Sequence, residues 1–247
     1  MIHPTAIISS SAKIHDNVEI GPYSIIHDNV EIGLGCKIGA YCELGLLTDL
    51  SKSNSLEIGS NSIIRSHSVI YIGSNIGDYF QSGHHICVRE NSVIGEGVQL
   101  GSRGDIQGDC IIGDYVKMHA DVHVGKNSKI GSFVWLFPEV LLTNDAMPPS
   151  EELIGPEIGD YTVIASKATL LPGVKIGNNC VIGAGSIVKE NIPNGKLATG
   201  SPAKIICEAK ILRMPNNPKI KAYPWRFRFH RGYPIHIVEN WIQEAKK

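Results

Sequence analysis

The sequence lacks several features that mark particular classes of protein. Only 6% of its 247 residues are aromatic, and the formal net charge of −1 gives no indication of a nucleic-acid or membrane partner. It has no apolar run of about 18 residues or more, the length that would suggest a membrane-spanning helix. The six cysteines include no CxxC pair, so neither a disulfide framework nor a zinc knuckle is indicated. The N-terminus lacks the layout of a signal peptide, and we therefore expect a cytoplasmic protein.

What the sequence does have is an aliphatic residue at every sixth position. Counted from Ile2, this position is aliphatic in 27 of 28 repeats, and Ser82 is the exception. Two insertions, 46–56 and 143–157, interrupt the count. A small residue precedes each aliphatic by two places. Glycine often follows the aliphatic, and we expect it there because glycine tolerates unusual backbone angles.

A period of six is typical of a parallel β-helix built from hexapeptide repeats. Each hexad forms a short strand and a corner, the aliphatic side chain fills the interior, and three hexads close a triangular coil. Stacked coils pair their backbones at about 4.8 Å, so the repeat predicts an all-β prism of roughly nine coils and ~45 Å. A β-sandwich with strands in these places by coincidence is the alternative fold.

The chain divides at about residue 202. Residues 1–202 form the predicted β-helix, and residues 203–247 form a basic, aromatic tail with net charge +7 against −8 for the rest. We expect a short helix between Pro234 and Lys246, with proline in its first turn. Arg226, Arg228 and Arg231 alternate with aromatic residues in the tail, a combination that can bind a nucleotide, so we expect the tail to pack against the prism and to contribute to a nucleotide site. Alternatively, Trp225 and Phe227 cap the open end of the last coil.

Two stretches of the sequence resemble a known family. The "HPTA" start and residues 170–204, which contain "GAGSIV", closely resemble the left-handed β-helix acyltransferases. The section from "GHHICVREN" to "LLTND" resembles members that N-acylate nucleotide-linked amino sugars. The resemblance implies a left-handed homotrimer with active sites between subunits. It also implies acyl transfer from acetyl-CoA or another acyl-CoA, with no permanently bound cofactor, in cell-surface glycan (lipopolysaccharide or O-antigen) assembly.

The same resemblance suggests which residues meet coenzyme A. Ala165, Ser166 and Ala184 would line the groove for its pantetheine arm. Lys189 and Lys204 would meet its phosphates, since lysine commonly binds phosphate as a point charge. The alternative for both lysines is an ordinary solvated surface charge.

Histidine suits the role of catalytic base because its pKa lies near the working pH. In relatives the catalytic histidine follows an inward residue by two places, and His84 holds that place after Ser82. We expect His84 to be catalytic, with structural hydrogen bonding as its alternative role. His119 and His123 are further candidates for catalysis or acceptor contact.

The second insertion favours an amine as the acyl acceptor. Relatives that acetylate hydroxyls often carry a histidine there, whereas this chain has Asn144 and Asp145. We expect Asp105 and Asp145 to contact the ammonium form of the acceptor, with Glu90 and Asn144 as further substrate-binding residues. Turn capping is the alternative role of the two aspartates.

Three rival functions remain. The spacing of His84, His119 and His123 resembles the zinc ligands of γ-class carbonic anhydrases, but the three occupy different places in their hexads, so we expect no metal. The N-terminal hexads resemble the UDP-N-acetylglucosamine O-acyltransferase of lipid A synthesis, whose relatives end in a larger helical domain. The third rival is a prism without catalytic activity. A nucleotide-sugar N-acyltransferase is the function that we expect.

Overall fold

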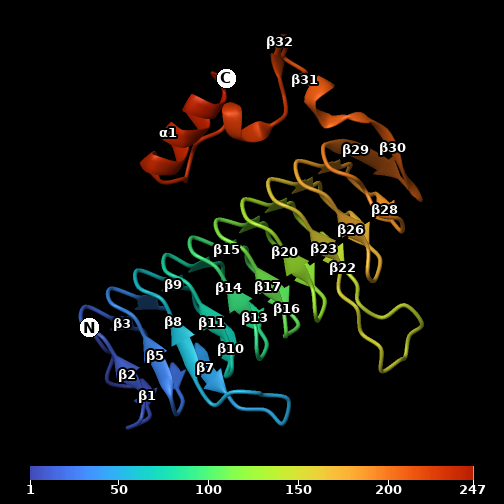
Figure 1. Ribbon diagram of the computed structural model, residues 1–247. Coiled ribbons are helices and arrows are strands. Elements are labelled where there is room, and N and C mark those ends of the chain that lie inside the picture. Colours follow the sequence, from blue (N-terminus) through green and yellow to red (C-terminus); the bar gives the residue numbers. More distant parts are fainter. Residues whose placement is uncertain (247) are drawn as a thin grey trace.

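The computed structural model describes residues 1–246 and confirms the β-helix (Figure 1). Successive hexads contribute in turn to three parallel sheets, which form the three sides of a prism. Sheet 1 consists of β1 (Ile7–Ile8), β4 (Ile25–Ile26), β7 (Glu43–Leu46), β10 (Val69–Tyr71), β13 (Cys87–Val88), β16 (Asp105–Ile106), β19 (His123–Val124), β22 (Leu141–Leu142), β25 (Thr169–Leu170) and β28 (Ile187–Val188). Sheet 2 consists of β2 (Lys13–Ile14), β5 (Val30–Ile32), β8 (Leu56–Ile58), β11 (Asn75–Ile76), β14 (Val93–Ile94), β17 (Ile111–Ile112), β20 (Lys129–Ile130), β23 (Glu157–Ile158) and β26 (Lys175–Ile176). Sheet 3 consists of β3 (Glu19–Ile20), β6 (Lys37–Ile38), β9 (Ile63–Ile64), β12 (Gln81–Ser82), β15 (Gln99–Leu100), β18 (Lys117–Met118), β21 (Trp135–Leu136), β24 (Val163–Ile164), β27 (Val181–Ile182), β29 (Lys196–Gly200) and β30 (Ala203–Glu208).

The expectation of nine coils is slightly too low. The three sheets contain 10, 9 and 11 strands. The last two strands of sheet 3, β29 and β30, pair as an antiparallel hairpin and have no hexad pattern, so the period could not reveal them. The expected boundary at residue 202 falls between these two strands. The hairpin therefore extends sheet 3 beyond the last repeat.

The aliphatic residue of each hexad fills the interior, and the corners explain the other repeat positions. In most coils the third residue after the aliphatic adopts a left-handed conformation. Examples are Asn17 (φ 58°) and Tyr23 (φ 57°). Our explanation for the glycine that follows the aliphatic is wrong at nearly all of these positions, because apart from Gly45 (φ 90°) such glycines do not have positive φ. A Cβ at Gly21 would lie 2.7 Å from the backbone nitrogen of Ala40. Glycine is therefore needed because the next coil approaches closely.

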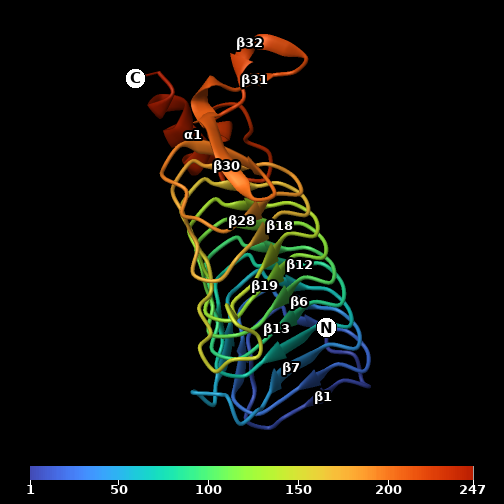
Figure 2. The same ribbon diagram turned by 90° about the vertical axis from the view of Figure 1, so that its right-hand side faces the viewer.

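Both insertions leave the prism at the corner between sheets 1 and 2 (Figures 1 and 2). Since β7 extends to Leu46, β8 begins at Leu56 and β23 begins at Glu157, the insertions cover 47–55 and 143–156, slightly less than expected. The first loop is tied to the prism by Asn91, whose side chain accepts a hydrogen bond from the Lys52 backbone (2.8 Å) and donates one to the carbonyl of Leu50 (3.0 Å).

The last part of the tail, which contains the C-terminal helix, folds back along the prism (Figures 1 and 2). It contains η1 (Ala209–Ile211), β31 (Arg213–Met214), β32 (Asn217–Lys221), η2 (Trp225–Phe227) and α1 (Ile235–Glu244), which confirms the expected helix. Within residues 1–246 no helix has the length and apolar character to cross a membrane. A second apolar cluster joins the tail to the corner between sheets 2 and 3 and includes Tyr115, Phe133, Tyr161, Val163, Trp225, Tyr233 and Trp241.

The tail packs on the side of the prism, so the alternative in which Trp225 caps the open end is wrong. Trp225 is buried, and its Nε1 donates a hydrogen bond to the carbonyl of Tyr161 (3.0 Å). Arg226 is also buried and donates two hydrogen bonds to Glu244 (3.2 and 2.6 Å) and one to Asn179 (2.7 Å). This arginine therefore holds α1 in place and is not available to a ligand.

Candidate active site

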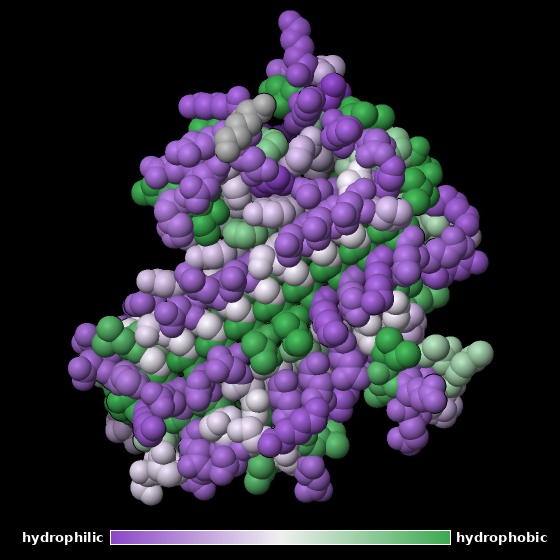
Figure 3. Space-filling model, in the orientation of Figure 1, coloured by the Kyte–Doolittle hydropathy of each residue, from purple (hydrophilic) through white to green (hydrophobic). Residues whose placement is uncertain are grey.

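A groove runs between sheet 3 and the tail, which overhangs the prism (Figure 3). It consists of two adjoining cavities. The first, of about 600 Å³, lies over β12, β15, β18 and β21 and is closed on one side by tail residues 229–232. The second, of about 480 Å³, continues toward the last coils, beneath tail residues 223–231. The two cavities share His119, Trp135, Phe229 and Arg231.

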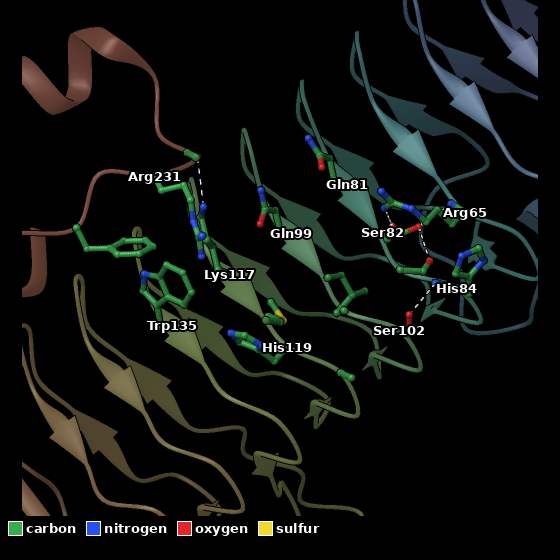
Figure 4. A pocket seen from close by; sticks show the side chains of 17 residues that line it. Arg65, Gln81, Ser82, His84, Gln99, Ser102, Lys117, His119, Trp135 and Arg231 are labelled. Atoms are coloured by element: carbon green, nitrogen blue, oxygen red, sulfur yellow. Dashed lines mark hydrogen bonds between the residues drawn. The ribbon is translucent and has the colours of Figure 1, made fainter.

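A column of outward side chains forms the floor of the first cavity (Figure 4). Each is the first residue of its strand, so it points away from the core while the next residue points inward. Gln81, Gln99, Lys117 and Trp135 are paired in register across four neighbouring strands. Because coils stack at about 4.8 Å, these four side chains follow one another at that spacing along the groove.

His119 lies where the two cavities meet. Its backbone N–H is fixed by the carbonyl of Leu136 (2.8 Å), and its ring stacks on Phe137 with centroids 4.8 Å apart. The ring of Trp135 lies 6.0 Å away on the same side. Partial burial among these rings lowers the pKa of His119 below its usual 6.5. At neutral pH the imidazole is therefore uncharged and can accept a proton.

His84 lines the same first cavity, two coils nearer the N-terminus (Figure 4). Its Nδ1 is hydrogen-bonded to Ser66 Oγ (2.8 Å), and its backbone N–H donates to Ser102 Oγ (3.1 Å). The buried hydroxyl of Ser82 accepts a hydrogen bond from the backbone N–H of Arg65 (2.9 Å), which accounts for the one polar residue in the aliphatic series. The expected structural hydrogen bond of His84 is thus present, while its catalytic role stays a prediction.

The second cavity contains the three residues expected to meet pantetheine. Ala165, Ser166 and Ala184 all line it, opposite the aromatic side chains of the tail. Its walls are mostly apolar and include Trp135, Phe137, Val163, Tyr223, Trp225 and Phe229. The two lysines expected at the phosphates lie elsewhere. Lys189 follows β28 of sheet 1, and Lys204 of β30 is exposed and ion-paired with Glu190 (3.4 Å).

His123 lies on another side of the prism, on sheet 1. Its Nδ1 donates a hydrogen bond to Asp105 (2.9 Å), which also accepts one from Gln107 (2.6 Å). Burial raises the pKa of the Asp105 carboxyl, but the hydrogen bonds from His123 and Gln107 outweigh this effect and the net pKa is lowered. The pair is therefore a carboxylate that orients an imidazole, a common arrangement for a general base. It does not share a cavity with His84 and His119 in the same chain.

The other expected substrate-binding residues make internal contacts. Asp145 accepts hydrogen bonds from the backbone of Met147 (3.1 Å) and from Ser150 (2.8 Å), and the Ser150 hydrogen bonds lower its pKa. It thus caps its own loop. The backbone carbonyl of Asn144 accepts a hydrogen bond from Ile154 (2.7 Å), which closes the base of that loop. Substrate contact by either residue stays a prediction.

Glu90 has no exposed surface, and it forms an ion pair with Arg89 (3.0 Å). Replacing Glu90 with alanine is expected to lower the free energy of unfolding by about 2 kcal/mol, because it removes a charge-assisted hydrogen-bond pair from a buried position. Chemical denaturation measures this change. Glu31→Ala is the control, since Glu31 forms similar pairs at an exposed site and its loss should leave stability almost unchanged. If Glu90→Ala has the denaturation midpoint of the wild type but binds substrate more weakly, Glu90 has the substrate-binding role predicted from the sequence.

The three histidines of the zinc alternative are not brought together by one chain. His84 and His119 lie along sheet 3, whereas His123 lies on sheet 1. In the part of the chain that the structure describes, no group of three or more His, Cys, Asp or Glu side chains is arranged to hold a metal ion. A three-histidine site would therefore require residues from another subunit.

Sequence reasoning missed Lys117 and Gln99 as residues of the groove, and it pointed to the arginines of the tail without separating Arg231 from the others. One signal could have identified Lys117 and Gln99. When the sequence is written in rows of three hexads, Gln81, Gln99, Lys117 and Trp135 fall in one column, and this column passes beside His84 and His119. No comparable signal exists for Arg231, because the tail has no period.

Comparison with known proteins agrees with this architecture. The family described as bacterial transferase hexapeptide (six repeats) matches residues 11–45 and 155–190. A Clostridium perfringens 2,3,4,5-tetrahydropyridine-2,6-dicarboxylate N-acetyltransferase is 49% identical over 49 residues, which are 20% of this chain and 21% of that protein. YvoF of Bacillus subtilis is 45% identical over 49 residues, which are 20% of this chain and 28% of YvoF. The matches thus span less than a third of these relatives.

Two solved structures share the fold over most of the chain. The UDP-N-acetylglucosamine acyltransferase of Arabidopsis superposes with a TM-score of 0.57 at 20% identity, over 84% of this chain and 74% of that one. That of Bacteroides fragilis gives a TM-score of 0.54 at 23% identity, over 100% of this chain and 83% of the other. The chain is thus a left-handed β-helix with the hexapeptide repeat found in acyltransferases.

Proposed function

We propose that this hexapeptide-repeat chain is an acyl-CoA-dependent N-acyltransferase that acts on the amine of a nucleotide-linked amino sugar, with acetyl-CoA as the simplest donor. The observation that carries the proposal is the position of His119 between two unlike cavities. The apolar second cavity suits a pantetheine arm, and the polar first cavity suits a sugar nucleotide. Acetyltransferase names among the relatives support the reaction class. Such a product serves cell-surface glycan assembly.

The reaction follows from this arrangement. The thioester carbonyl lies at the junction of the cavities, and the acceptor amine approaches from the first cavity. The amine nitrogen attacks the carbonyl carbon while His119 accepts a proton from it. Backbone N–H groups at the coil corners stabilise the oxyanion. The tetrahedral intermediate then breaks its C–S bond, the amide is released, and the thiolate takes the proton from the imidazolium to give the free thiol of coenzyme A.

We also propose a homotrimer in which sheet 1 faces a neighbouring subunit. The outward positions of this sheet include apolar side chains that one chain leaves exposed, among them Ile7 (65%), Ile187 (39%) and Leu141 (37%). The His123–Asp105 pair lies on the same sheet, so a neighbour's groove placed against it would receive a second imidazole. Light scattering of the purified protein measures the oligomeric state, and a monomer would contradict this part of the proposal.

The pH dependence of kcat is expected to show an acid limb below about pH 6.5. Burial lowers the pKa of His119, so the base stays neutral until the pH falls below the usual value for histidine, and activity is then lost as the ring is protonated. The measurement is kcat across pH 5 to 8, which reports groups in the enzyme–substrate complex. His119→Gln should lack this limb. A limb that persists in the variant belongs to another group.

The proposed function is tested by thiol release from acetyl-CoA in the presence of a panel of UDP- and dTDP-linked amino sugars. Release with at least one amino sugar, and none with the corresponding hydroxy sugar, is the expected result. Activity only with an acyl carrier protein donor and UDP-N-acetylglucosamine would favour the O-acyltransferase alternative. One stoichiometric zinc per subunit, lost in His119→Ala, would favour the metalloenzyme.

A further inference from the structure

We propose that Lys117 and Arg231 form a diphosphate-binding subsite in the first cavity, which the tail completes. The inference rests on the proposed function for the identity of the ligand, either a nucleoside diphosphate sugar or coenzyme A. The subsite itself is inferred from the burial, contacts and charges of the residues that line the cavity.

Lys117 is a buried cation with unused donors. It is only 7% exposed, although it stands on the outer face of sheet 3. Its Nζ donates one hydrogen bond, to the tail carbonyl of Gly232 (3.2 Å), and lies 4.3 Å from the ring centroid of Tyr233 and 5.3 Å from that of Trp135. An ammonium group carries three donors, so two remain for a ligand. The aromatic faces fix its position and exclude water from one side.

A second cationic side chain lies beside Lys117, and no acidic residue lines the first cavity. Arg231 lines the same cavity, with its guanidinium over the ring of Phe229 (5.6 Å). The two charges are close enough that Arg231, after burial, contributes to a lowered pKa of Lys117. Of the 17 lining residues none is Asp or Glu (Figure 4). In the described residues 1–246 neither cation is ion-paired with a carboxylate. A buried charge without a partner is costly, so an anionic ligand would stabilise this arrangement.

The shape of the site favours a diphosphate over a single carboxylate. Two cations match two negative groups, and arginine and lysine are the usual phosphate-binding residues. Gln99 and Gln81 continue the column from Lys117, one coil apart at about 4.8 Å, and offer amide donors and acceptors beyond the charged pair. Lys117 is two residues from His119, so a bound diphosphate would lie beside the reacting groups. This favours the sugar nucleotide as its source.

The tail is required because it supplies Arg231 and positions Lys117. Gly232 has φ +80°, and a Cβ on it would lie 2.7 Å from Nζ of Lys117. A side chain at this position would therefore strain the backbone and displace the ammonium group. Gly232→Ala thus moves the ammonium group of Lys117 without removing a charge. This variant therefore tests whether ligand binding depends on the position of that ammonium group.

The test is isothermal titration calorimetry of the full-length protein with UDP, dTDP, coenzyme A and inorganic pyrophosphate. Lys117→Met and Arg231→Gln are each expected to weaken nucleoside diphosphate and pyrophosphate binding by about 10- to 100-fold, the effect of one charge-assisted hydrogen bond. Gly232→Ala should weaken it in the same direction. Lys129→Met is the matched control, because Lys129 is the first residue of β20 on sheet 2 and is exposed beside Glu157 (3.9 Å). It should bind as the wild type does.

The outcomes separate the inference from the proposed function. Weaker binding of UDP or dTDP with unchanged coenzyme A supports the sugar nucleotide as the source of the diphosphate. Weaker binding of coenzyme A alone supports the same subsite with the donor as its ligand. Unchanged affinities in Arg231→Gln, an exposed position whose change should not affect folding, overturn the subsite while leaving the acyltransferase proposal intact. Absence of binding by the wild type overturns both.

Discussion

Replacing His119 with alanine is expected to lower kcat by about a hundred-fold, the usual effect of removing a general base. The imidazole lies where the two cavities meet, it stacks on Phe137, and partial burial lowers its pKa. It is therefore ready to accept the proton that the attacking amine loses. Steady-state turnover with acetyl-CoA and a suitable amino sugar measures the effect, and KM should change far less than kcat.

The histidine variants need two controls. His119→Gln keeps most of the side-chain volume beside Phe137, so equal losses in both variants would assign the effect to the lost base and not to a cavity. His84→Ala is the second control, because the sequence predicted His84 as the base whereas the proposed mechanism gives that role to His119. If the proposed mechanism holds, this variant, whose lost imidazole is hydrogen-bonded to Ser66 in the wild type, retains most of its turnover. A hundred-fold loss in His84→Ala with normal turnover in His119→Ala would reverse the assignment and return the base to the residue that the hexad pattern first indicated.

Replacing Trp225 with alanine is expected to destabilise the docking of the tail by about 3 kcal/mol, the lower part of the range for buried tryptophan. Its ring lies 5.5 Å from Trp241 and 5.5 Å from Tyr233, and its Nε1 hydrogen bond holds the tail to Tyr161. Local opening of α1 should therefore become about a hundred-fold more frequent. Hydrogen exchange of residues 235–244 measures this change, while exchange in the central coils should stay unaltered.

Loss of the tail should also weaken ligand binding, since it removes one wall of both cavities. Ile235→Ala serves as the control, because Ile235 is 77% exposed on α1 and contributes little to docking. Equal protection of α1 in Trp225→Ala and in the wild type would mean that the tail is held by other contacts. Arg226 and its hydrogen bonds to Glu244 would then be the first to examine.

The resemblance to the β-helix acyltransferases pointed to His84, Ala165, Ser166 and Ala184, and the structure places all four along the same groove. They share one groove because residues at similar places in stacked coils lie on one face of the prism. His119, a further candidate from the sequence, also lines this groove. His123 was grouped with it from proximity in sequence. Four residues carry the chain around a corner, which puts the two histidines on different sides of the prism.

Residues of the tail and insertions were not predictable in this way. Asp145 was expected to bind substrate, yet Ser150 in its own loop satisfies its carboxylate. Arg226 and Arg231 look equivalent in the sequence. Docking buries the first against Glu244 and leaves the second in the groove. The tail and the insertions have no repeat that would assign a sequence position to a side of the prism. The partners of their side chains therefore depend on how these segments pack.

The sequence by itself determined the prism, its three faces and the histidines on each, because a strict period of six fixes which side chains point inward and which coils are neighbours. The tertiary structure alone decided that the tail returns over sheet 3, divides the groove into two cavities and brings Arg231 to the buried Lys117. That decision depends on aromatic packing between residues far apart in the chain, such as Trp225 and Tyr161, and no local pattern encodes contacts of that kind.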